Sequence, residues 1–169
     1  MPLAGWGIRL LAVLIDAVVV YVLAQLATVP LAGQASAAMQ SWLDEVTRLS
    51  QAGGPIDLPG LFATYPLREQ VITVTIALVV AVVYHAAMLR WRSATLGKLA
   101  CRLRVVPVDR GTEAGQLAWS TIAIRVGLWA VLGQLIFVFR LVDGLFPLWQ
   151  SKRQALHDLA AKTQVVVRR

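Results

Sequence analysis

Few side chains in this sequence have the type and spacing to do chemistry, and they are ionisable residues in apolar surroundings. Arg9 and Asp16 lie within one apolar stretch, His85 lies near the end of a second, and Arg125 lies in a third. A charge at the centre of a membrane helix costs about 2.5–3.5 kcal/mol on insertion scales, so each is a functional candidate by default. Two interpretations of Asp16 stay open: a structural pair with an arginine that fixes helix packing, or a cation or proton site.

The positions of these residues along a helix indicate their partners. Arg9 and Asp16 are seven residues apart, on nearly the same helix face but about two turns from each other, which is too far for direct contact. Arg9 can extend its charge to the membrane surface, whereas the short Asp16 needs a partner within the protein, and Arg125 is the expected counter-ion. His85 is either a satisfied interfacial histidine or a further member of this network.

The remaining reactive residue types form no catalytic pattern. Asp143 lies three residues after Arg140 and is expected to pair with it on one helix face. Cys101 is the single cysteine, so it forms no internal disulfide and is expected to fill apolar space. Because His85 and His157 lack an acidic cluster at metal-ligand spacing, and no phosphate loop is present, we expect no enzyme, no cofactor and no metal.

The composition is that of a membrane protein. Of 169 residues, 58% are hydrophobic and 15% charged, and the mean hydropathy is +0.68. Soluble domains typically hold about 45–50% apolar and about 25% charged residues, so a disordered chain and an ordinary soluble enzyme are both disfavoured. The net charge of +7 is then better explained by an anionic membrane surface than by nucleic acid, which we do not expect as a partner.

Three apolar regions are candidates for membrane helices: residues 6–29, residues 70–89 and residues 117–149. Asp16 in the middle of the first argues against a cleaved signal peptide and for a retained helix. The third is too long for one simple span and short for two, so we expect a helical hairpin with its second arm tilted or re-entrant; one tilted span is the alternative. The sequence thus predicts an all-α membrane protein with three to four transmembrane or re-entrant helices.

The charges between these regions predict the orientation. Residues 30–69 hold two basic and four acidic residues, residues 90–116 hold six basic and two acidic, and residues 150–169 hold five basic and one acidic. The positive-inside rule places the loop 30–69 outside and the loop 90–116, the N-terminus and the tail 150–169 in the cytoplasm. We expect a single domain over residues 1–169.

The two connecting loops show local patterns of their own. In the outer loop, Met39, Trp42 and Val46 share one face of an expected helix. That face lies on the outer leaflet, packs against a partner protein, or belongs to a plain surface helix. The valine-rich segments 103–108 and 163–167 are typical of short strands. We expect them to pair as a small two-stranded β element at the cytoplasmic membrane surface, which covers their edges.

Three blocks carry a family resemblance: residues 9–16 read RLLAVLID, residues 94–106 read ATLGKLACRLRVV, and residues 153–167 read RQALHDLAAKTQVVV. Together they resemble the RDD family of small bacterial membrane proteins, named for one arginine and two aspartates. Arg9, Asp16 and Asp158 match those three signature positions, and Arg125 matches a further family arginine. One departure is Lys162, which stands where the family usually has glycine before the last strand.

The resemblance implies an inner-membrane domain that transports an unidentified ligand, with cation/proton exchange among the proposals, or an accessory part of a larger membrane assembly. It also suggests that Arg9 pairs with Asp158 and locks the tail beneath the first helix, while Asp16 lies deeper, near Arg125. Asp143, His85 and His157 are expected contributors to this polar network.

We expect a non-catalytic accessory subunit in the bacterial cytoplasmic membrane, whose partners are the lipid bilayer and a larger complex or further copies of itself. Its contact surface would be the face that carries Met39, Trp42 and Val46. The alternative is an oligomeric transporter that uses Asp16. The two functions differ in whether Asp16 faces water or is buried in a fixed network.

Overall fold

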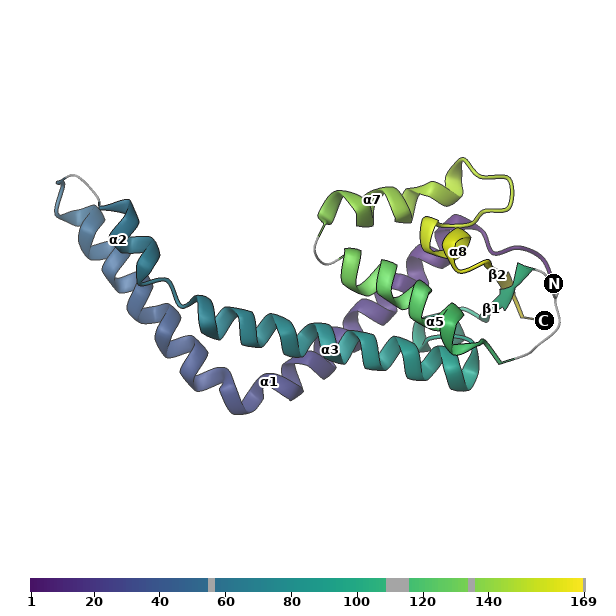
Figure 1. Ribbon diagram of the computed structural model, residues 1–169, viewed down its shortest axis with the longest axis horizontal. Helices are drawn as coiled ribbons and strands as arrows, with labels where there is room; N and C mark the ends of the chain where they lie inside the picture. Colours follow the sequence, from purple (N-terminus) through teal and green to yellow (C-terminus); the bar gives the residue numbers. More distant parts are fainter. Residues whose placement is uncertain (55–56, 109–115, 134–135, 169) are drawn as a thin grey trace. The chain divides into compact units, whose positions relative to one another are not determined.

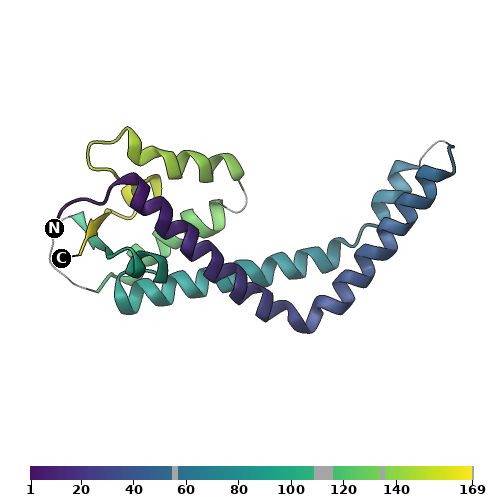
Figure 2. The ribbon, with the colours of Figure 1, turned by 180° about the vertical axis from the view of Figure 1, so that it is seen from behind.

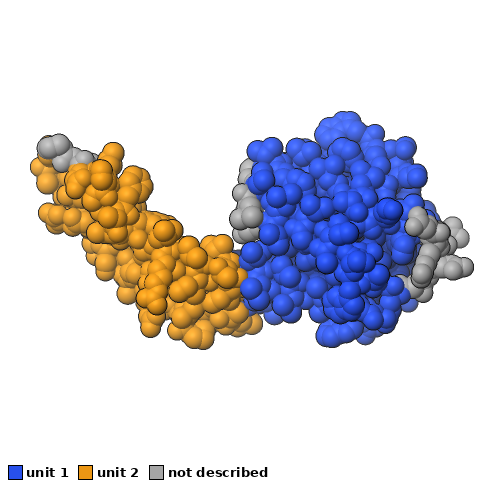
Figure 3. Space-filling model, in the orientation of Figure 1, with its two compact units in different colours: residues 1–23, 78–169 blue, residues 24–77 orange. Residues whose placement is uncertain are grey.

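A computed structural model describes residues 1–54, 57–108, 116–133 and 136–168 of the chain. The chain divides into two compact units, which are coloured in Figure 3. Unit 1 comprises residues 1–23 and 78–169, and unit 2 comprises residues 24–77. The first signature aspartate and the whole C-terminal half of the chain therefore belong to unit 1.

Two long helices dominate the secondary structure (Figure 1). Helix α1 covers Trp6–Gln51 and helix α3 covers Leu67–Arg92. Both are long and apolar enough to cross a membrane. The first was expected to end near residue 29, but α1 continues through Pro30, because residues 31–51 are rich in alanine and other helix formers that outweigh one lost amide donor. Much of the expected outer loop is therefore helical.

In unit 2, residues 61 and 65 contact the face of α1 that was expected to be free for lipid or a partner. Helix α2 covers Leu58–Ala63. The indole of Trp42 in α1 donates a hydrogen bond to the Leu61 carbonyl at 3.0 Å, and its ring meets Tyr65 edge-on at 5.3 Å between centroids. Met39, Trp42 and Val46 are all half-buried. An indole that is paired within its own chain adds little as a docking anchor, so this face is a weaker candidate surface than expected.

The two-stranded sheet expected from the valine-rich segments is confirmed. Strand β1 covers Leu103–Pro107, strand β2 covers Thr163–Val167, and the two pair antiparallel with Val105 opposite Val165. The N-terminal segment joins them, since the Ala4 amide donates to the Val165 carbonyl at 3.0 Å. The start of the chain, β1 and β2 thus meet at one place, where Figure 1 also shows both termini. Figure 2 shows the first turns of α1 leaving from the same place.

Each strand of this sheet follows the same short motif. Helix α4 (Leu96–Ala100) leads into β1 through Arg102, whose φ is +55°, and helix α8 (Leu156–Ala160) leads into β2 through Lys162, whose φ is +50°. The two segments lie 60 residues apart and read TLGKLACRLRVVP and ALHDLAAKTQVVV. Both strands show the same burial pattern. The helix–strand segments 95–107 and 155–167 therefore form an approximate internal repeat, and the strands of the two copies pair with each other.

The positive φ of Lys162 explains why a glycine suits this position. A non-glycine residue in the left-handed region carries steric strain of about 1 kcal/mol or more. Lys162→Gly should therefore raise the free energy of unfolding by about 1 kcal/mol, measured by thermal unfolding in detergent. Lys152→Gly is the control, because Lys152 is exposed and its φ is not positive. Equal effects of the two substitutions would contradict this explanation.

A helical hairpin connects the two halves of the repeat. Its first arm is α5 (Trp119–Val126) continued by the π-helical turn η2 (Gly127–Leu132). Its second arm is α7 (Phe137–Leu145) continued by the 3₁₀ turn η3 (Phe146–Leu148). Residues 117–149 thus hold two helical arms. Strand β1 precedes the hairpin and β2 follows it. Because these two strands pair in one sheet, the chain enters the hairpin from the sheet and returns to the sheet after it.

The core of unit 1 lies beneath the sheet. Buried side chains from β1, β2, α3, α5 and the residues just before α5 pack together, and they include Leu89, Leu103, Leu117, Ile122 and Val165. Cys101 is buried in the same cluster, as expected for a small apolar filler. This core includes Cys101 at the end of α4 and Val165 in β2, the strand that follows α8. Helices α4 and α8 carry several of the polar residues of the site.

Candidate functional site

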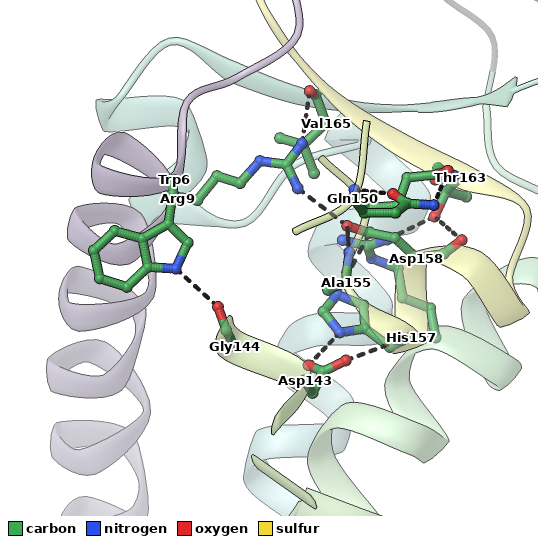
Figure 4. A network of polar contacts seen from close by, with 12 residues as sticks. Trp6, Arg9, Asp143, Gly144, Gln150, Ala155, His157, Asp158, Thr163 and Val165 are labelled. Atoms are coloured by element: carbon green, nitrogen blue, oxygen red, sulfur yellow. Dashed lines mark hydrogen bonds and ion pairs between the residues drawn. The ribbon is translucent and has the colours of Figure 1, made fainter. Parts of the chain in front are cut away.

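Asp158 is the centre of a buried ion network in unit 1 (Figure 4). Its carboxylate is 1% exposed, and its Oδ2 lies 3.2 Å from Nη1 of Arg9. Nη1 of Arg125 contacts its other oxygen, Oδ1. The contact between Arg9 and Asp158 that the family resemblance suggested is present, and Arg125 is a second cation on the same carboxylate.

The backbone of the tail fixes this network. Asp158 is the third residue of α8, and its carboxylate accepts a hydrogen bond from the Ala155 amide at 3.1 Å, as a capping aspartate does. The guanidinium of Arg9 also donates to the Val165 carbonyl at 3.1 Å, and that of Arg125 donates to the Thr163 hydroxyl at 2.6 Å. Both arginines therefore bind α8 and β2 together.

The charges around Asp158 favour its ionised form. Burial raises the pKa of this carboxyl, but the charge of Arg125, the electrostatic interaction with His157 and the charge of Arg9 outweigh burial and hold the pKa well below its usual range. The carboxylate stays charged at any physiological pH. It is a fixed anion that joins two cations, rather than a group that exchanges protons.

Asp16 lies in a second, separate set of contacts. Its carboxylate is 2% exposed and accepts hydrogen bonds from the Tyr84 hydroxyl and the Gly97 amide, both at 2.7 Å. The Thr95 hydroxyl contacts its other oxygen. The expected pairing of Asp16 with Arg125 is therefore wrong: Arg125 bonds to Asp158, because the hairpin carries it against α8 instead of α4.

Lys98 is the cation nearest to Asp16 among the ion pairs of the described residues. Its Nζ lies 3.9 Å from Oδ2 of Asp16 and 3.3 Å from the Thr95 hydroxyl. Burial and the nearby charge of Arg125 lower the pKa of Lys98 to about 8, despite the opposing effect of Asp16. At neutral pH Lys98 is therefore charged and only loosely paired, with 15% of its side chain exposed.

Gly97 allows α4 to approach α1 closely. A Cβ at this position would overlap the Ala12 carbonyl oxygen and lie 2.9 Å from Cγ of Asp16. Three of the four residues of the segment TLGK thus have a physical role. Thr95 and the amide of Gly97 bind Asp16, the missing side chain of Gly97 permits the approach, and Lys98 places a positive charge beside the carboxylate.

Asp143 binds the second copy of the repeat as Asp16 binds the first. It accepts a hydrogen bond from the His157 amide at 2.9 Å, and its Oδ2 lies 2.6 Å from Nδ1 of the same histidine. His157 and Gly97 occupy equivalent positions, 60 residues apart. The expected pair between Asp143 and Arg140 is therefore wrong, since Arg140 lies over the ring of Trp129, 5.1 Å from its centroid.

His85 is buried and satisfied locally. Its Nδ1 lies 2.7 Å from the Ala81 carbonyl oxygen, and its ring packs against Tyr84 and Trp129. It adjoins the Asp16 network through Tyr84 rather than through an ion pair. Tyr84, which no sequence pattern pointed to, is a more direct partner of Asp16 than His85 is. The one signal in the sequence that could have indicated Tyr84 is its hydroxyl group within an apolar stretch.

A cavity of about 280 Å³ lies among these residues in unit 1. Its charged lining includes Arg9, Asp16 and Asp158, and its lining residue Trp6 donates its indole N–H to the Gly144 carbonyl at 2.9 Å (Figure 4). The charged lining residues are Arg9, Asp16, Lys98, Arg125, Arg140, Asp143 and Asp158. Within the described residues, no three His, Cys, Asp or Glu side chains gather as metal ligands would.

This arrangement joins the three sequence blocks that carried the resemblance, and residues 3–162 match the RDD family. The chain belongs to the RDD family. The match covers nearly the whole chain, and Arg9, Asp16 and Asp158 all fall within it. Comparison with curated proteins and with solved structures gives no match.

In this RDD chain, the signature residues form two clasps rather than one triad. Arg9 and Asp158 attach the start of α1 to the tail, with Arg125 as a third member. Asp16 attaches α1 to the segment TLGK in α4. The two clasps bind the two copies of the internal repeat to the same helix.

Proposed function

We propose that this RDD-family chain is an integral protein of the bacterial cytoplasmic membrane and a non-catalytic accessory subunit of a larger membrane assembly. The family and the two long apolar helices support the membrane part. Only 11% of the most apolar 18-residue window is buried within the protein in α1, and likewise in α3. Apolar surface of this extent needs a cover, and lipid or a partner provides one.

The fold supports an orientation with both termini in the cytoplasm. The N-terminal segment, β1 and β2 all meet in one sheet, and an open sheet edge is not stable in hydrocarbon. The chain must therefore cross an even number of times between these three segments. Two crossings by α1 and α3, followed by a re-entrant hairpin, satisfy this condition. The excess of basic residues in 90–116 and 150–169 favours the cytoplasmic side.

The burial and hydrogen bonding of Asp16 are the main support for an accessory role. A cation or proton site needs a carboxylate with free oxygen atoms and access to water. Asp16 is 2% exposed, and both of its oxygens accept hydrogen bonds from fixed donors. This carboxylate is suited to holding α4 against α1. The signature residues then stiffen a scaffold, and the exposed apolar helices are left to contact other membrane proteins.

Co-purification from native membranes tests the accessory role. The tagged full-length chain is extracted in mild detergent, and its partners are quantified by mass spectrometry. We expect a larger membrane protein in stoichiometric amount. Phe62→Ser removes a side chain that is 71% exposed on α2 and should reduce that recovery, whereas Arg48→Gln, on the same unit, should not. Recovery of the chain alone, as an oligomer, would contradict the proposal.

The cavity beside Asp16 and Lys98 favours transport as a second candidate function. Cation-driven proton flux in proteoliposomes distinguishes the two. Under the accessory role, wild type and Asp16→Asn should both give the flux of empty liposomes. Flux in the wild type that is lost in Asp16→Asn would support transport and overturn the accessory role.

A further inference from the structure

The cavity in unit 1 combines apolar walls with positively charged side chains, and we propose that it binds an amphipathic anion. The anionic head group would lie at Lys98, and a single hydrocarbon chain would lie along the walls. The apolar lining comes chiefly from α1, η2 and α7, and includes Leu10, Val13, Trp129 and Leu141. This inference goes beyond the accessory role, because docking to a partner requires no small molecule.

The lining charges do not cancel. Four arginine and lysine side chains face three aspartates in the cavity lining. Asp158 neutralises only one of the two arginines that bind it, and Asp143 is bound by His157. An excess of positive charge attracts an anion, and the attraction is stronger at the lining cations that are shielded from water than at Arg140, which is exposed.

Two cations of the lining are available to a head group. Lys98 has Asp16 at 3.9 Å, but the oxygens of that carboxylate already accept three other hydrogen bonds. Arg140 contacts the face of Trp129, and its charge has no carboxylate among the ion pairs of the described residues. A carboxylate or phosphate would complete the coordination of either cation through charge-assisted hydrogen bonds.

The size of the cavity limits the ligand. Its volume of about 280 Å³ exceeds that of an apolar cavity of about 150 Å³ that holds benzene. It lies just below the usual range of small-molecule pockets, about 300–1,000 Å³. A cavity of this volume holds a small head group with part of one hydrocarbon chain, whereas both chains of a phospholipid exceed it. The ligand that supplies the head group is either a free single-chain amphiphile or one end of a membrane phospholipid.

Thermal unfolding of the full chain in phosphatidylcholine nanodiscs tests the proposal. Dodecyl phosphate is the probe, dodecanol is the neutral probe of equal chain length, and inorganic phosphate is the head group alone. We expect dodecyl phosphate to raise Tm, and the other two to leave it unchanged. An equal shift with dodecanol, an equal shift with inorganic phosphate, or no shift with dodecyl phosphate would each overturn the proposal.

The lipid composition of the nanodisc distinguishes the two sources. If phosphatidylglycerol nanodiscs raise Tm and abolish the further shift by dodecyl phosphate, a membrane phospholipid supplies the head group. If dodecyl phosphate gives the same shift in both kinds of nanodisc, the ligand is a free amphiphile. Both outcomes support an anionic amphiphile.

Substitutions in the lining test the position of the head group. Lys98→Gln should weaken the affinity for dodecyl phosphate by about tenfold or more, since it removes a charged hydrogen-bond donor. Arg140→Gln, on the exposed side of α7, should weaken it to a smaller extent and remains informative if Lys98→Gln does not fold. Lys152→Gln lies outside the cavity lining and should have no effect. Wild-type affinity in both lining variants would overturn the proposal.

The pH dependence of binding provides a readout that a purely structural lysine would not change. Burial and Arg125 lower the pKa of Lys98 to about 8, so the affinity should fall as the pH rises from about 7 to about 9. The charged or titratable groups that face Lys98 are Arg9, Asp16, His85, Arg125 and Asp158. Lys98→Arg keeps its charge over this range and should bind at both pH values, whereas a flat wild-type profile would contradict the proposed contact.

Discussion

Asp158→Asn is expected to lower the free energy of unfolding by about 3–5 kcal/mol, which is typical when one member of a buried ion network loses its charge. The asparagine has nearly the same shape, so packing changes little. The guanidinium groups of Arg9 and Arg125 would then remain buried without a counter-charge. The attachment of the tail to α1 should loosen at the same time.

Thermal unfolding in detergent and limited proteolysis of the tail measure these two effects. Glu45→Gln is the matched control, because it also replaces a carboxylate by an amide but acts on an exposed pair with Arg48. Exposed pairs contribute little to stability, so this control should unfold like the wild type. An unchanged Tm for Asp158→Asn would show that the clasp does not hold the tail.

The acid dependence of this effect follows from the pKa of Asp158. The folded-state pKa is lowered, so the ionised carboxylate contributes stability above its unfolded pKa of about 3.9. This contribution is lost only as the pH falls through the lower folded-state pKa. The Tm difference between the wild type and Asp158→Asn should therefore persist at about pH 4. A difference that disappears at about pH 5 would contradict the network.

Gly97→Ala is expected to destabilise the protein by about 3 kcal/mol or more, which is at the upper end for overpacking in a core. The added methyl group would overlap a carbonyl oxygen of α1. That oxygen belongs to the backbone of a long helix and cannot move as a side chain can. To accommodate the methyl group, α4 would have to shift away from α1, which would also break the hydrogen bond between Gly97 and Asp16.

Gly127→Ala is the matched control in the same unit. Gly127 lies in a helical turn, and a Cβ there meets nothing within 4 Å. The substitution Gly127→Ala should therefore be neutral or slightly stabilising, because alanine has a higher helix propensity than glycine. Both variants are compared with the wild type by thermal unfolding in detergent. A wild-type Tm for Gly97→Ala would show that α4 does not approach α1 this closely.

The local structure of this protein could be predicted well where the pattern repeats over several residues. Valine-rich runs gave both strands, and the long apolar runs gave the two long helices and the hairpin. The end of the first helix was missed because Pro30 usually stops a helix, and alanine-rich sequence on its far side carried the helix on to Gln51. At such a point the helix propensity of the surrounding residues competes with the helix-breaking effect of one proline, and neither alone decides where the helix ends.

The sequence by itself determined the two long apolar helices, the family and the contact between Arg9 and Asp158, because these follow from composition and from signature residues. Only the tertiary structure decided which other charges meet. Arg125 bonds to Asp158 and Asp16 to α4, since the direction in which each helix presents its charges depends on how the repeat and the hairpin pack. Contacts between residues 33 and 81 positions apart follow from that packing, and no local pattern in the sequence encodes it.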